Sequence, residues 1–194
     1  MKLASLIAVA GFAAAAAAQG TLTYSWAVSD TGNGDGIIEP GEAAMLTMIG
    51  TMDPGATGIA GTIYDIVGLN NWDTGTVSDF TNHLAELTDN GQLQANGDIL
   101  AIESFQLPPA FNPNFDNSNP VTLYTLTWTP NDYTNRLVSV GDSNHLNNDV
   151  YTDDFGTSVS YTGVTGTVEF SVVPAPASMA LLGLGGLVAG RRRR

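Results

Sequence analysis

Apolar and polar residues alternate along most of the centre of the chain. In the stretch 21–28 every second position is apolar, which is the period of a strand with one buried face. Similar runs follow, separated by turn residues such as the pair Asn90-Gly91. The last run is expected to turn Val164 and Phe170 toward a core. The runs cover residues 43–52, 58–69, 98–107, 121–129, 136–140 and 164–173.

One apolar series departs from alternation and predicts a helix. Its members are Val77, Phe80, Leu84 and Leu87, which recur at spacings of three, four and three residues. Gly91 is available to end the helix. Many short strands with Gly, Asn and Pro between them are typical of sandwiches and barrels. The pattern therefore predicts a mainly β chain, with a single β-sandwich and one short helix over residues 19–172.

The first residues have the pattern of a secretory signal peptide. Lys2 precedes an apolar stretch and a run of alanines that supplies a small-x-small cut site after Ala18. We therefore predict a signal peptide over residues 1–18, export of the chain, and a mature protein that begins near Gln19.

The last residues combine a short apolar segment with a cluster of positive charge. Residues 177–190 are 14 uncharged, mostly apolar residues. As a helix they would span about 21 Å, against a hydrocarbon core of about 30 Å. We expect this hydrophobic helix to insert into the membrane at least transiently. The pattern allows two outcomes: the helix stays as a permanent anchor, or it is removed. The cluster that resists translocation is Arg191, Arg192, Arg193 and Arg194.

Two prolines stand ahead of this segment. The end of the chain resembles the PEP-CTERM sorting signal of Gram-negative bacteria that make exopolysaccharide. The resemblance lies in the order of three parts: the motif Val173, Pro174, Ala175 and Pro176, then the apolar helix, then the arginine cluster. The usual core of that signal is Val-Pro-Glu-Pro, and the VPAP form here looks like a variant used in planctomycete-like proteins. The resemblance covers residues 173–194. It implies processing by an exosortase-type membrane enzyme and delivery to the cell surface or extracellular matrix.

The predicted mature chain is strongly acidic. Between residues 19 and 174 Arg136 is the only Lys or Arg against 19 carboxylates, a formal charge of −18. Nucleic acid and anionic lipid are poor partners for such a surface, because both bind through clustered Lys and Arg. Divalent cations, basic proteins and neutral glycans are favoured. The chain has no cysteine, so no disulfide stabilises the exported domain.

The stretch DTGNGDGIIEPGE, residues 30–42, offers hard oxygen donors on a glycine-rich loop, which is the chemistry that calcium prefers. It resembles the calcium loop of EF-hands and dockerins. The resemblance implies Ca²⁺ as a cofactor. The equal alternative is a surface turn that binds no ion. The candidate ligands are Asp30, Asn33, Asp35, Glu39 and Glu42.

Residues for catalysis are scarce. Without cysteine there is no thiol nucleophile, and His83 and His145 are too few for a zinc site. The triplet Gly141-Asp142-Ser143 has the letters of a hydrolase block, but no histidine follows His145. We therefore predict a protein that is not an enzyme. The acidic stretch 142–154 is expected to be a solvated loop, with a weaker cation site as the alternative.

Three tryptophans make carbohydrate binding an alternative function. Trp26 and Trp128 share a face with other apolar residues and are expected in the core. Trp72, in the turn-like stretch 69–75, is the tryptophan expected to be exposed and to contact a glycan.

The middle of the chain is similar to bacterial cohesin-like sandwiches, through the runs 58–69 and 121–130 that follow the Asp/Gly loop. The similarity implies a jelly-roll or immunoglobulin/cohesin-like sandwich, and a fold does not settle a function. We predict a secreted structural or adhesive component of the cell surface or extracellular matrix. Its expected partners are exopolysaccharide or surface proteins. A carbohydrate-binding module is the second hypothesis and a secreted hydrolase the third.

Overall fold

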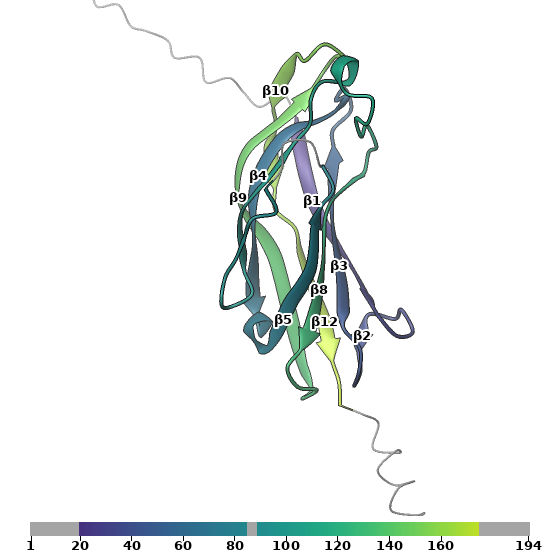
Figure 1. The fold of residues 1–194 in the computed structure, drawn as a ribbon, viewed down its shortest axis with the longest axis vertical. Helices are drawn as coiled ribbons and strands as arrows, with labels where there is room; N and C mark the ends of the chain where they lie inside the picture. The colour runs from purple at the N-terminus through teal and green to yellow at the C-terminus, as the bar shows by residue number, and fades with distance from the viewer. Residues whose placement is uncertain (1–19, 85–88, 175–194) are drawn as a thin grey trace, which may run out of the picture.

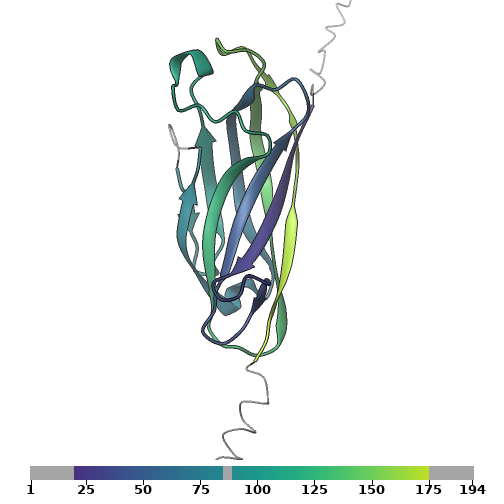
Figure 2. The ribbon, with the colours of Figure 1, turned by 90° about the vertical axis from the view of Figure 1, so that its right-hand side faces the viewer.

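Two β-sheets stacked face to face form the fold (Figure 1, Figure 2). The structure, a computed structural model, describes residues 20–84 and 89–174, so the predicted signal peptide lies outside it. No helix in these two ranges is long and apolar enough to cross a membrane. The elements are β1 (Thr21–Asp30), β2 (Ile37–Ile38), β3 (Ala44–Met52), β4 (Gly58–Asn70), η1 (Trp72–Thr74), β5 (Gly75–Asn82), β6 (Gln92–Leu93), β7 (Ile99–Phe105), η2 (Pro109–Phe111), β8 (Val121–Pro130), β9 (Arg136–Tyr151), β10 (Ser158–Ser160), β11 (Thr162–Val164) and β12 (Thr167–Val172).

The strand order brings together segments that are far apart in the sequence. One sheet has the order β11-β1-β3-β8-β5, and the other has the order β2-β12-β9-β4-β7-β6 with β10 paired to β9. Most neighbours are antiparallel, whereas β1 with β11 and β2 with β12 are parallel. The last strand, β12, therefore lies between β9 and the short β2, which comes from the first quarter of the chain.

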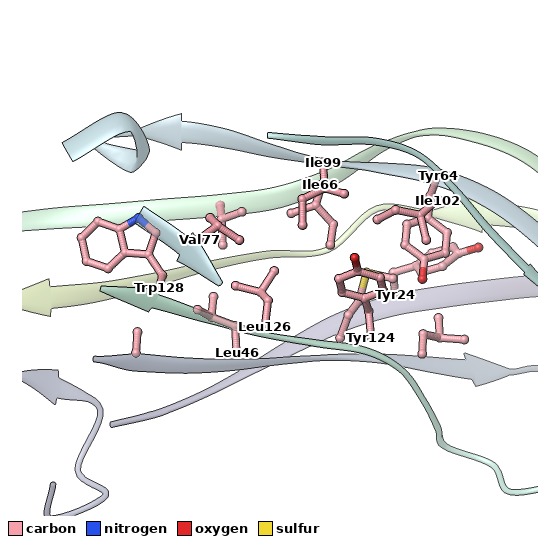
Figure 3. Packing of buried hydrophobic residues seen from close by; sticks show 14 of the residues in the cluster. Tyr24, Leu46, Tyr64, Ile66, Val77, Ile99, Ile102, Tyr124, Leu126 and Trp128 are labelled. Atoms are coloured by element: carbon pink, nitrogen blue, oxygen red, sulfur yellow. The ribbon is translucent and has the colours of Figure 1, made fainter. Parts of the chain in front are cut away.

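Side chains on the inner faces of the two sheets form one core (Figure 3). Leu22 and Tyr24 of β1 are buried, as the alternation predicted. Trp128 of β8 is also fully buried, which confirms its expected place in the core. Its Nε1 donates a hydrogen bond to the carbonyl of Trp72 at 2.9 Å, and the two indole rings stack with centroids 5.9 Å apart. Two packed aromatic rings thus close the end of the core where Trp72 and Trp128 lie.

A buried polar contact connects the two sheets through the core. The hydroxyl of Tyr24, on β1, lies 2.5 Å from the hydroxyl of Thr62 and donates to Oδ1 of Asn148 at 2.6 Å. Thr62 is on β4 and Asn148 is on β9, so one phenol bonds to two strands of the opposite sheet. Buried polar groups are costly unless they are bonded, and these three groups satisfy one another.

The helix predicted for the series from Val77 to Leu87 is wrong where the structure describes it. Val77 and Phe80 lie in strand β5, and Leu87 falls outside the described residues. The pairing of β5 with β8 shifts between Ser78 and Thr81, where Asp79 has a left-handed φ of 48°. This bulge adds one residue to the strand. Inward positions then fall three apart, which imitates helical spacing.

The acidic stretch 142–154, expected as a solvated loop, is mostly strand. Strand β9 continues to Tyr151, and Asp142 and Asn148 on it are buried. Asn144 and Asn147 have left-handed φ values, and the register with β4 shifts repeatedly along this part. These irregularities break the two-residue period by which a strand is recognised in a sequence.

The inward position predicted for Val164 is also wrong, whereas Phe170 is buried as expected. The predicted run divides into β11, which ends at Val164, and β12, which begins at Thr167. Between them the amide of Gly166 donates to the carboxylate of Asp142. The break between β11 and β12 changes the face on which the side chains of β11 lie, so Val164 does not share the inward face of Phe170.

A methyl group at Gly75 is expected to disturb the packing of Trp128. An added Cβ would lie 2.1 Å from a carbon of the indole ring, which is fully buried and held by its hydrogen bond. We expect Gly75→Ala to lower the free energy of unfolding by about 1–3 kcal/mol in chemical denaturation. The neighbouring surface variant Thr76→Ala is expected to change it by no more than about 0.5 kcal/mol. Equal losses in the two variants would contradict the packing account.

Candidate functional site

The Asp/Gly loop begins at Asp30, the last residue of β1, and folds around its carboxylate. Oδ1 accepts the amides of Gly32 and Gly34 at 2.7 and 2.8 Å, and Oδ2 accepts the amide of Gly36 at 2.8 Å. Gly34 and Gly36 have φ near +80°, a conformation that favours glycine. The Gly34 amide, with those of Gly36 and Gly32, holds the pKa of Asp30 below its usual range although burial opposes this. One buried carboxylate thus organises the first half of the loop.

The other carboxylates of the loop bond to nearby backbone. Oδ1 of Asp35 accepts the amide of Ile37 at 2.8 Å, and its Oδ2 accepts the side-chain amide of Asn33. Oε2 of Glu42 accepts the amide of Glu39 at 3.0 Å. Each is a local turn contact of the kind that Asp and Asn side chains commonly make.

Across the described loop, the structure does not gather three or more of the predicted carboxylate ligands of calcium into one group. In the part of the chain that the structure describes, no group of three or more Asp, Glu or His side chains is placed to hold a metal ion. The loop closes instead through the hydrogen bonds above. Calcium binding therefore stays a prediction. The predicted ligands are Asp30, Asn33, Asp35, Glu39 and Glu42.

The same loop supports the strand that leads into the sorting motif. Ile38 of β2 pairs in parallel with Val172 of β12, and the amide of Val173 donates to the carbonyl of Ile38 at 3.0 Å. Ile38 and Val172 are fully buried, whereas Pro174 is exposed. Strand β12 therefore ends beside β2, directly before the Val173-Pro174 pair (Figure 1). The remaining residues of the predicted signal lie outside the described ranges: Ala175, Pro176 and Arg191, Arg192, Arg193 and Arg194.

The expectation that Trp72 is exposed is wrong. Its side chain packs on Trp128, and the residue is only 3% exposed. The turn at Gly97 covers it, since a Cβ at Gly97 would lie 3.0 Å from the indole nitrogen. No open ring face is left to stack on a sugar. The predicted glycan contact depended on an exposed Trp72 ring, and the structure does not provide one.

A polar surface hollow of about 190 Å³ lies beside Trp72. Four of its side chains are engaged. Asp98 accepts the amide of Gly68 at 2.8 Å and the side-chain amide of Asn96 at 2.8 Å. The side chains of Asn70 and Asn71 both donate to the carbonyl of Leu137. The hollow offers amide and carboxylate groups without an exposed aromatic face. Its lining residues are Gly68, Leu69, Asn70, Asn71, Trp72, Asp73, Asn96 and Asp98.

Asp142 and His145 meet between the sheets. Nε2 of His145 lies 2.6 Å from Oδ2 of Asp142, and the two side chains are 7% and 0% exposed. Asp142 also accepts the indole N–H of Trp26 at 2.9 Å, and the imidazole lies against the Tyr24 ring. A substrate has no direct access to groups buried in this way. Sequence reasoning misses the contact because residues three apart in a regular strand face opposite sides, and the left-handed Asn144 changes that.

The comparison of the sequence with known families finds one match. Residues 172–194 match the PEP-CTERM protein-sorting motif. The chain carries a PEP-CTERM sorting motif. This confirms the resemblance drawn from the Pro-x-Pro, apolar and arginine order. The motif indicates an exported protein that is processed by an exosortase and reaches a surface or extracellular location. No curated protein matches the chain.

Solved structures of cohesins are similar to the described sandwich. The seventh ScaB type I cohesin from Pseudobacteroides cellulosolvens has 10% identity and a TM-score of 0.52, over 80% of this chain and 92% of that one. The cohesin module of a family 33 glycoside hydrolase from Clostridium perfringens has 11% identity and a TM-score of 0.51, over 79% and 98%. The Coh-OlpC-Doc435 cohesin–dockerin complex from Clostridium thermocellum has 11% identity and a TM-score of 0.50, over 79% and 95%. At these identities the likeness confirms the predicted fold, a cohesin-like β-sandwich.

We expect the Asp30 loop to be sensitive to acid. Because the pKa of Asp30 is lowered by folding, its charge stabilises the native state above the ordinary Asp pKa of about 3.9, and this contribution is lost as pH falls through the lowered value. Asp30→Asn should lower the melting temperature at neutral pH, and the two proteins should converge once the pH falls below the lowered pKa of Asp30.

Thermal melts across this pH range provide the measurement, and Asp73→Asn, an exposed position in η1, is the control. A deficit of Asp30→Asn that is the same at every pH would contradict the account. The same melts in calcium and in chelator test the calcium prediction, since an ion bound only by the folded loop raises the melting temperature.

Proposed function

We propose that this protein is an adhesive component of the cell surface or extracellular matrix that binds another protein. The proposal depends on one observation, the direct continuity between a cohesin-like sandwich and a sorting motif. Val172 is the last residue of strand β12 and the first residue of the matched motif. With no linker between them, an intact domain stands immediately next to the site of sorting.

The fold likeness supports a protein partner. One similar structure is a cohesin in complex with a dockerin, so a sandwich of this shape binds a protein module in that case. Transfer of that role to this chain is part of our proposal. The partner here need not be a dockerin.

The charge of the domain supports a basic partner. The only Lys or Arg in the described ranges is Arg136, and it is paired with Asp132 at 2.6 Å. A surface with this balance attracts cationic proteins and repels acidic ones.

The arrangement of the titratable groups supports binding over catalysis. The contact between Asp142 and His145 is covered by Tyr24 and Trp26, so these two residues serve the packing of the sandwich. Catalytic groups need access to substrate and a mutual geometry around a reacting atom.

Deletion of the gene in the host tests this function. Cells without the protein should aggregate less and retain less matrix, and the wild-type gene should restore both. A chain that lacks residues 173–194 should restore neither, because it is exported without the sorting motif. Surface fractions probed with an antibody to the sandwich measure delivery independently of aggregation. Normal aggregation in cells that lack the gene would contradict the proposal.

A further inference from the structure

Two phenylalanines project from the end of the sandwich that is remote from the sorting junction. Phe155, in the turn between β9 and β10, is 79% exposed, and Phe111, at the end of η2, is 67% exposed. Leu107 beside them is 44% exposed. β10 and η2 lie at one end of the molecule, and β12 leaves it at the other (Figure 1). We call Leu107, Pro108, Pro109, Phe111 and Phe155 the distal patch.

The residues of the distal patch belong to one continuous surface. The amide of Ala110 donates to the carbonyl of Asp154 at 2.9 Å, so η2 is bonded directly to the β9–β10 turn. The turn also packs on Pro108, since a Cβ at Gly156 would lie 2.9 Å from the ring of that proline. Phe111 and Phe155 are therefore presented by two segments that support each other.

The turn that carries Phe155 is held in a fixed shape. Oδ1 of Asp153 accepts the amides of Phe155, Gly156 and Thr157 at 2.9, 3.0 and 3.0 Å. The amide of Thr152 donates to the carbonyl of Thr157 at 2.9 Å. A phenylalanine at the tip contributes little to folding, because most of its surface stays in water. An aromatic side chain on an ordered turn loses little entropy on binding, which is the property of an interface anchor.

The charges around the distal patch are negative. Asp154 is exposed in the turn itself, and Asp116, which follows η2, is half-buried beside Gln106. Arg136 begins β9 and pairs with Val172 of β12, so it lies at the opposite end. A second copy of this chain would bring like charges together, and an anionic membrane would be repelled as well. Charge complementarity therefore selects a basic partner.

We propose that the distal patch docks a protein surface in which an apolar recess is surrounded by Lys and Arg. Phe155 and Phe111 fill the recess, and Asp154 and Asp116 face the basic rim. This inference rests on the proposed adhesive function and names the surface that performs it. The location suits the role, because the patch is at the end of the domain away from the sorting junction.

The test uses the exported protein from the host surface and a fluorescein-labelled synthetic peptide of alternating leucine and lysine. Fluorescence anisotropy should show binding that weakens about tenfold in Phe155→Ser and in Phe111→Ser, the loss expected when an interface anchor is truncated. The control is Leu69→Ser, whose residue is 56% exposed near the other end of β4, and it should bind as the wild type does. Matched peptides with serine for leucine, or glutamate for lysine, should not distinguish the variants from the wild type.

Equal affinity of all variants for the leucine–lysine peptide would overturn the assignment, since binding would then depend on charge alone. Phe155-dependent self-association, or Phe155-dependent binding to phosphatidylglycerol vesicles or a neutral polysaccharide, would also overturn it and assign the patch to that occupant. The aggregation assay separates this proposal from the function on which it rests. If gene deletion lowers aggregation and Phe155→Ser does not, the adhesive function stands and the distal patch is not its surface.

Discussion

Backbone amides, and not basic side chains, satisfy most of the negative charge of this protein. The described ranges contain one Lys or Arg, so carboxylates have almost no cation to pair with. Eleven of them, including the Asp132 that pairs with Arg136, accept a hydrogen bond from a backbone N–H. They are Asp30, Asp35, Glu42, Asp53, Asp65, Asp89, Asp98, Asp116, Asp132, Asp142 and Asp153. Hydrogen bonds to a charged acceptor are among the stronger ones in proteins, which suits a domain that has no disulfide.

Two of these carboxylates order the loops at the two ends of the sandwich. At one end Asp30 orders the loop that carries β2, and β2 pairs with the strand that enters the sorting motif. At the other end Asp153 orders the turn that presents Phe155. Between the ends, the hydroxyl of Tyr24 bonds across the core to the opposite sheet. The domain thus places the strand that enters the sorting motif at one end and the exposed Phe155 at the other.

The sequence was sufficient for the strands whose alternation is regular, such as β1 and β8, and for the sorting motif, whose three parts are contiguous. It was not sufficient where a bulge changes the face of a strand. Asp79 makes Val77 and Phe80 imitate a helix, and Asn144 brings Asp142 to His145. These positions are set by pairing with strands far away in the chain, which a local pattern does not contain.

The Asp/Gly loop illustrates the same limit in the candidate site. Its composition predicts candidate calcium ligands but not the hydrogen bonds that the carboxylate of Asp30 accepts from three amides of its own loop. These bonds depend on the positive φ values at Gly34 and Gly36, which do not follow from the spacing of the carboxylates. Trp72 is a second case, because only the folded chain places Gly97 over its ring.

The most direct test of the account is the intact mass, with terminal peptides, of the protein recovered from its host's surface fraction. The expected result is a mature chain that begins near Gln19 and ends close to Pro174, just after the last residue of β12 and within the sorting motif. Any additional mass at that end would identify what attaches the domain to the surface. A chain that still contains Arg191 to Arg194 would contradict exosortase processing and show a protein that stays tethered by its own tail.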